Sequence, residues 1–244
     1  MTRILAFTAL ALGGCAFENG PAREVPVELL SPAAEPVTTD LGWEVTLTEG
    51  RVFLHYVTFL AGSGSAEESG STQALLEAEP AATFKHAGHG SGAEAPAEGT
   101  KVGELLADAA VDLLAAPVDL GTAVFACGAE ATEAHLLVAP PEEGGPEMHG
   151  AGLYLAGSAV PPGGGVPVAF EAALPVDAEI AITGLDLDAD DLTGLEIHVP
   201  REGWLDGIDF AALPGGAILD GSVEAEAIEE RLSDGGFHVH TGEE

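Results

Sequence analysis

The sequence predicts a mainly β fold, an antiparallel β-sandwich with one or two short helices and a long loop rich in Gly, Ser, Ala and Glu. Two observations support this class. Short runs of alternating or β-branched apolar residues recur along most of the chain, as in strands with a buried face. Gly and Pro, with 33 and 16 copies in 244 residues, separate these runs where turns are expected. Several short strands at this rhythm are typical of a sandwich.

Local patterns predict the individual elements. Residues 43–48 alternate apolar and polar side chains and residues 52–60 are β-branched and aromatic, so they predict a hairpin or a bulged strand pair around a turn at Glu49-Gly50. Apolar residues at three- and four-residue spacing predict one amphipathic helix over 101–115, ended by Pro117. The remaining patterns predict a short acidic helix at 223–231 and extended segments at 122–126, 133–139, 152–156, 166–172, 179–183, 195–199 and 237–240.

The N-terminal residues predict export and a lipid anchor. Arg3 precedes an apolar run over 4–12 that is too short to span a bilayer and is followed by small residues. Leu12-Gly13-Gly14-Cys15 looks like a bacterial lipobox, in which the leader is cut just before a cysteine that carries diacylglycerol. We therefore expect residues 1–14 to be a signal peptide and Cys15 to be the lipidated residue that ties the chain to a membrane. A cleaved secretory leader with an incidental cysteine is the alternative.

Behind the anchor, the composition predicts a tether and then one domain. Residues 15–40 are rich in Pro, small and acidic residues, which predicts an extended tether with a short strand at 25–30. The folded domain is expected over 41–244, a length that one core can support. Within it, residues 61–100 contain few large apolar side chains and are too many for an ordinary connection, so they predict a mobile insertion.

The charge of the chain restricts its partners. With 41 acidic and 7 basic residues, the formal net charge is −34. Such a charge repels nucleic acid and anionic head groups and attracts cations. Nucleic acid is therefore excluded as a partner. An acidic surface that serves only solubility is the alternative explanation.

Two histidine pairs predict a metal site. His86 and His89 lie in the predicted loop, where a turn through Gly88 can direct both imidazoles to one ion. His238 and His240 share a face of an extended chain, because strand side chains repeat every second residue. Neutral imidazole nitrogen suits copper or zinc, and nearby carboxylates can orient the rings. The two pairs could supply four nitrogen ligands to a copper or zinc ion, or each pair could act separately.

Other chemically active residues receive weaker assignments. Met148 and His149 form a further candidate pair, since thioether and imidazole are both copper ligands, although packing roles are the alternative. Cys127 stands in an apolar segment and is expected to be a small buried side chain. Histidines inside predicted strands are expected to be hydrogen-bonded within the fold; these are His55, His135 and His198. No catalytic motif is present in the sequence, so we expect no enzyme activity.

The segments Trp43-Glu44-Val45-Thr46-Leu47 and His86-Ala87-Gly88-His89, with the strand-rich remainder, resemble lipoproteins of high-GC Gram-negative bacteria. More loosely, residues 41–220 are similar to the MbnP-like periplasmic β-sandwich proteins associated with copper. That resemblance implies a sandwich that binds metal through histidines and a tryptophan. By resemblance to Gram-negative lipoproteins, the absence of Asp after Cys15 implies the outer membrane.

The sequence therefore predicts a lipid-anchored protein of the cell envelope that binds copper or zinc for sequestration, delivery or sensing. Its expected partners are the membrane, the metal ion and an envelope protein. Two alternatives stay open: a structural or adhesive envelope lipoprotein without metal, and a hydrolase that uses a histidine-bound metal.

Overall fold

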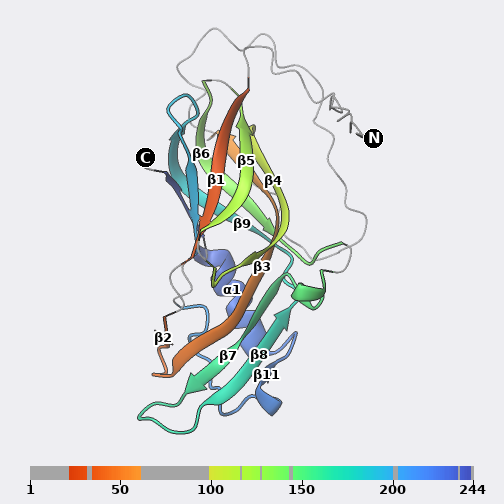
Figure 1. The fold of residues 1–244 in the computed structure, drawn as a ribbon, viewed down its shortest axis with the longest axis vertical. Helices are drawn as coiled ribbons and strands as arrows, with labels where there is room; N and C mark the ends of the chain where they lie inside the picture. Colours follow the sequence, from red (N-terminus) through yellow and green to blue (C-terminus); the bar gives the residue numbers. More distant parts are fainter. Residues whose placement is uncertain are drawn as a thin grey trace, which may run out of the picture.

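The computed structural model describes residues 22–31, 35–61, 99–115, 117–126, 128–142, 145–199, 203–235 and 237–242. The described chain is mainly β, as predicted, and its strands form one curled, mixed sheet. Two neighbouring pairs run parallel and the other pairs run antiparallel. Figure 1 shows a curled upper part and a lower layer, with one long strand running through both.

The long strand is β3 (Glu44–Ala61), which has 18 residues. Its first half pairs with β7 (Leu153–Val160) and, at its start, with β2 (Val37–Thr38). Its second half pairs with β4 (Thr100–Asp112) on one edge and β6 (Glu130–Val138) on the other. Each half of β3 therefore belongs to a different part of the sheet.

The other strands extend the sheet from β3 in both directions. In the upper part, β6 continues to β9 (Ala178–Asp188), and β4 continues through β5 (Val118–Phe125), β1 (Arg23–Leu30) and β10 (Leu195–His198) to β12 (His238–Thr241). In the lower layer, β7 continues to β8 (Val168–Leu174) and β11 (Ala217–Ile218). Short 3-10 turns occupy Pro146–Met148 and Pro214–Gly216.

Two of the three register shifts along β3 change which of its residues face the core, and they explain why its sequence suggested two strands. The pairing shifts against β7 between Leu47 and Glu49, and against both β4 and β6 between Leu54 and Tyr56. Each bulge changes which alternate residues face the core, from Val45 to Leu54 and then to Phe59. The predicted hairpin turn at Glu49-Gly50 is wrong, because the strand continues through a bulge there.

The predicted helix over 101–115 is also wrong, since these residues form β4 and the turn after it. The buried positions Leu105, Val111 and Leu113 follow the two-residue period of a strand. On the opposite face, Leu106 and Ala110 are apolar too. Leu106 is 71% exposed, and Ala110 packs against a small cluster of Phe53, Met148 and Tyr154. Apolar residues on both faces gave a helix-like spacing in a strand.

The folded domain includes the segment from Arg23 to Leu30, which lies before the predicted start of the domain at residue 41. The short strand expected at 25–30 is present as β1, but it lies inside the sheet between β5 and β10. Val25, Val27 and Leu29 are 0 to 1% exposed. This part of the predicted 15–40 tether therefore belongs to the folded domain.

The helix predicted at 223–231 is confirmed as α1 (Val223–Gly235). Ser222 caps it, because the Ala225 amide donates to Ser222 Oγ at 3.2 Å. Ile228 and Leu232 are buried in the core and α1 packs against β9. Among the described residues, no helix has both the length and the apolar character needed to cross a bilayer.

The close approach of β7 to the first bulge of β3 generates a stability prediction. A Cβ added at Gly157 would lie 2.3 Å from the Thr46 carbonyl oxygen, so the backbone itself must move. We expect Gly157→Ala to lower the free energy of unfolding by about 2 kcal/mol or more in chemical denaturation. Gly194→Ala is the matched control, since the nearest atom to its added Cβ is 3.9 Å away. Equal stability of the two variants would contradict this packing.

Candidate functional site

Several predicted site residues lie outside the described residues. These are Cys15, His86, His89 and Cys127, and the predictions made for them stay predictions. The structure does describe the remaining histidines: His55, His135, His149, His198, His238 and His240. Some of these histidines are hydrogen-bonded or packed within the fold, whereas others are placed so that they could bind a ligand.

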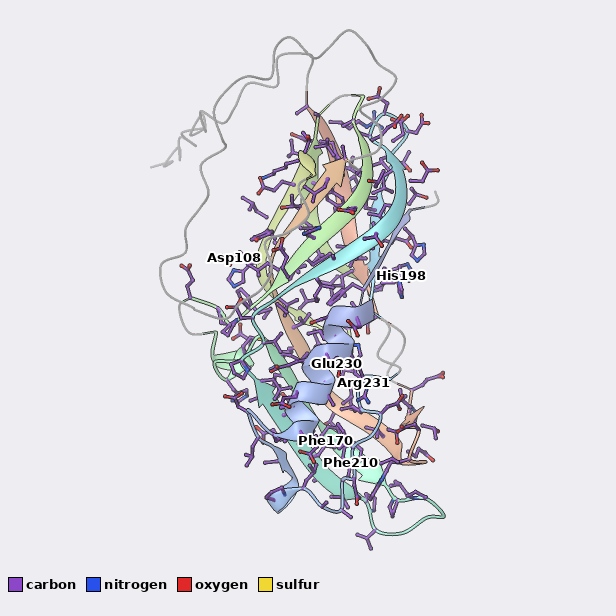
Figure 2. All side chains as sticks on the ribbon, turned by 180° about the vertical axis from the view of Figure 1, so that it is seen from behind. Asp108, Phe170, His198, Phe210, Glu230 and Arg231 are labelled. Carbon is purple, nitrogen blue, oxygen red and sulfur yellow. The ribbon has the colours of Figure 1, made fainter. Side chains whose placement is uncertain are left out.

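Three histidines and one glutamate come together on the outward face of β10 and β12. Glu196 pairs with His240 across the two strands, and His198 pairs with His238. Residues paired in this way share a face, and Ile197 and Val239 between them are buried in the core. Glu196, His198, His238 and His240 therefore form one surface cluster, here called the histidine patch. The label of His198 in Figure 2 marks the position of the histidine patch.

Within the histidine patch, the rings of His198 and His240 are direct neighbours. Their centroids are 4.7 Å apart with an angle of 79° between the planes. Two imidazoles on one tetrahedral zinc, with bonds of about 2.1 Å, have centroids about 5 Å apart. The observed spacing is thus close to that of two ligands on one ion.

Glu196 orients one of these rings. Its Oε2 lies 3.0 Å from Nε2 of His198, and the two side chains are 32% and 40% exposed. Because a carboxylate only accepts, Nε2 carries the proton of this bond and the lone pair of a neutral His198 is on Nδ1. Metal-binding histidines commonly have such a carboxylate partner on the second nitrogen.

The histidine patch is incomplete as a metal site. Within the described residues, no group of three or more His, Cys, Asp or Glu side chains stands so that it could hold an ion. The patch supplies two adjacent imidazoles, with His238 beside them in the register. The remaining coordination positions of an ion at the patch would face outward.

A shallow hollow of about 210 Å³ lies next to the histidine patch. Glu28 of β1 and Glu196 of β10 are paired neighbours that line it, together with Pro26 and Gly242. The two carboxylates place negative charge beside the imidazoles, which favours the approach of a cation.

The Met148 and His149 pair has packing roles in the structure. Met148 is fully buried in a small apolar cluster with Phe53 and Tyr154. His149 is exposed and stacks on the Tyr154 ring at a centroid distance of 4.5 Å. The thioether and the imidazole thus lie in different surroundings, which does not favour a shared ion.

His55 and His135 are engaged within the fold, as expected. His55 Nδ1 lies 3.2 Å from an Asp108 carboxylate oxygen and its Nε2 lies 3.2 Å from the Pro140 carbonyl oxygen. His135 is 5% exposed, and its Nδ1 lies 3.1 Å from Glu179 Oε1. Asp108 and His198 lie on opposite sides of the molecule in Figure 2, so the His55 pair is separate from the histidine patch.

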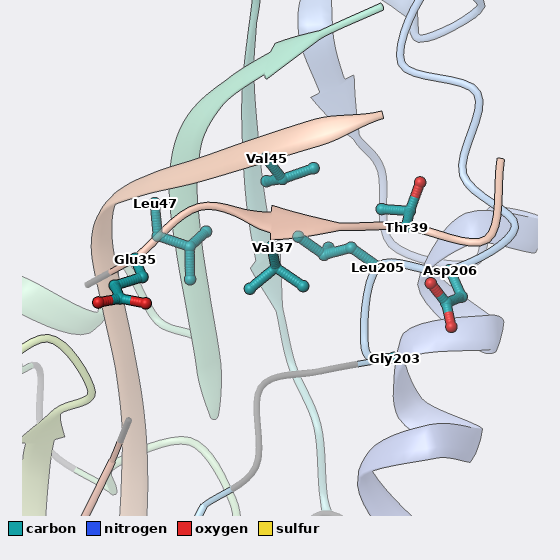
Figure 3. Close-up of a pocket in the computed structure, with 8 residues that line it drawn as sticks. All are labelled: Glu35, Val37, Thr39, Val45, Leu47, Gly203, Leu205 and Asp206. Atoms are coloured by element: carbon teal, nitrogen blue, oxygen red, sulfur yellow. The ribbon is translucent and has the colours of Figure 1, made fainter. Parts of the chain in front are cut away.

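Another hollow lies between β2, β3 and the segment near Leu205 (Figure 3). Its apolar side chains are those of Val37, Val45, Leu47 and Leu205. Its volume of about 20 Å³ suits no more than a water molecule. The hollow is therefore too small to serve as a ligand site.

No protein family, no curated protein and no solved structure matches the chain. The function is therefore inferred from the sequence and from the geometry of the described residues.

The two tyrosines of the chain allow a direct test of the electrostatic surroundings of their side chains. Burial and then the charges of Glu179, Glu104 and Asp177 raise the pKa of Tyr56 above its ordinary value. Burial, followed by Glu171, raises the pKa of Tyr154. We expect alkaline titration of tyrosinate absorbance to show both transitions above pH 10.0, the ordinary value.

In a Tyr56→Phe background, Glu171→Gln should lower the pKa of Tyr154, because it removes a nearby negative charge and replaces the carboxylate that accepts from the Tyr154 hydroxyl with a weaker, neutral amide acceptor. Circular dichroism at each pH ensures that the chain is still folded. An unchanged Tyr154 pKa in that variant would contradict the contact with Glu171.

Proposed function

We propose that this protein is a lipid-anchored protein of the cell envelope that binds a transition metal ion, copper or zinc, at the histidine patch. The observation that carries the proposal is the His198 and His240 ring pair, with His198 held by Glu196. The metal would be bound for sequestration, delivery or sensing. This site keeps the predicted His238 and His240 and adds a histidine from β10.

The chemistry of the histidine patch favours a transition metal over calcium or magnesium. Neutral imidazole nitrogen is a good ligand for zinc and copper, whereas calcium and magnesium prefer oxygen. The carboxylate of Glu196 supports one ring in the manner of an outer-shell ligand. A net charge of −34 raises the concentration of cations around the whole protein.

The cellular location in this proposal comes from the N-terminal sequence. Lipidation at Cys15 after removal of residues 1–14 would hold the protein at a membrane, in the outer membrane of a Gram-negative envelope by the resemblance stated above. An envelope protein that supplies or receives the ion would then be the partner. We propose binding rather than catalysis, because the sequence carries no nucleophile-elbow, nucleotide-binding or metalloprotease motif.

Metal binding by variants tests the proposal. We expect the untagged chain to bind zinc in equilibrium dialysis at about 0.15 M salt, an ionic strength that screens diffuse attraction to surface carboxylates. His198→Ala and His240→Ala should each weaken zinc binding at least tenfold, because each removes one of the two adjacent imidazoles. Glu196→Gln should weaken it by about tenfold through loss of the outer carboxylate.

His149→Ala is the matched control, since that exposed histidine stacks on Tyr154 away from the histidine patch. A separate variant with His86→Ala and His89→Ala measures any contribution from the predicted loop pair. Zinc binding that is unchanged in both His198→Ala and His240→Ala would refute the assignment. Retention of neither zinc nor copper by the unmodified chain, with copper measured by the same dialysis, would favour a structural or adhesive lipoprotein.

A further inference from the structure

We infer that the metal at the histidine patch is completed by a second copy of this chain, so that one ion bridges two patches. This inference rests on the proposed function and adds the identity of the remaining ligands. Each copy would contribute His198 and His240, giving four imidazole nitrogens around one zinc ion.

The first argument is the shortage of ligands within one chain. Zinc bound as a structural ion takes four protein ligands, whereas the patch presents two imidazoles at suitable spacing. Within the described residues, no group of three candidate ligands stands so that it could hold an ion. One carboxylate oxygen of Glu196, Oε2, is already engaged with His198 Nε2.

The second argument is the position of the patch. β12 is the last strand of its path in the described sheet, and both of its histidines are exposed. The ligands stand on the outward face, so an ion bound to them would lie outside the core and within reach of another molecule. A two-fold axis through the ion places the same pair of imidazoles on its opposite side, as in a self-complementary dimer.

The third argument concerns charge, which makes the association depend on the metal. Two chains that each carry −34 repel one another, and a second copy would bring its own Glu196 and Glu28 carboxylates to the patch. A divalent cation at the shared site attracts both sets of carboxylates. At about 0.15 M salt, repulsion beyond roughly 8 Å is screened, so the dimer should form better there than at low salt.

The test is sedimentation velocity of the full, untagged chain in detergent micelles that outnumber the protein, with a non-chelating reductant that prevents disulfides. Zinc chloride is added in steps at about 0.15 M salt. We expect a monomer without zinc, conversion to a dimer that is complete near one-half zinc per chain, and return to monomer with EDTA. His198→Ala and His240→Ala should each abolish the dimer.

Two variants serve as controls that should keep the zinc-dependent dimer: His149→Ala, and His86→Ala combined with His89→Ala. One zinc per chain on a protein that stays monomeric would overturn this inference and leave the proposed function intact. A dimer that survives His198→Ala or His240→Ala, or that is lost with His86 and His89, would also overturn it. Absence of both zinc and copper binding would instead defeat the proposed function itself.

Discussion

The fold depends on the continuous hydrogen bonding of β3, which is paired on both edges along much of its length. The two bulges let a single strand serve two parts of the sheet, because each bulge changes the set of residues that faces the core. His55 lies at the second bulge, where its ring joins the Asp108 carboxylate to the Pro140 carbonyl. This contact connects β3, β4 and the segment after β6 at the position where the pairing register changes.

The position of the histidine patch follows from the order of the strands at the β12 end of the same sheet. β1 pairs with β5 on one edge and runs parallel to β10 on the other, and β12 then pairs with β10. The buried residues Ile197 and Val239 hold the inward faces of β10 and β12 in the core. Their neighbours must consequently face outward, which brings Glu196, His198 and His240 together without any direct contribution from the core.

The strand segments and α1 could be predicted from the sequence because their apolar periods are local. The same reasoning failed at β4, where Leu106 and Ala110, on the face away from the main core, are apolar like the residues inside. It also anticipated the shared face of His238 and His240, a property of any extended chain. It did not identify His198 as their neighbour, because the pairing of β10 with β12 joins segments about forty residues apart and no local pattern encodes that register.

The central claim is that His198 and His240 bind the same ion. Histidine side-chain nuclear magnetic resonance, with the ring nitrogens labelled, tests it most directly because each ring reports its own protonation and ligation. On addition of zinc, the account predicts that the ring nitrogens of His198 and His240 shift together, while those of His55 and His135 do not. Zinc binding that leaves His198 and His240 unshifted would contradict the claim.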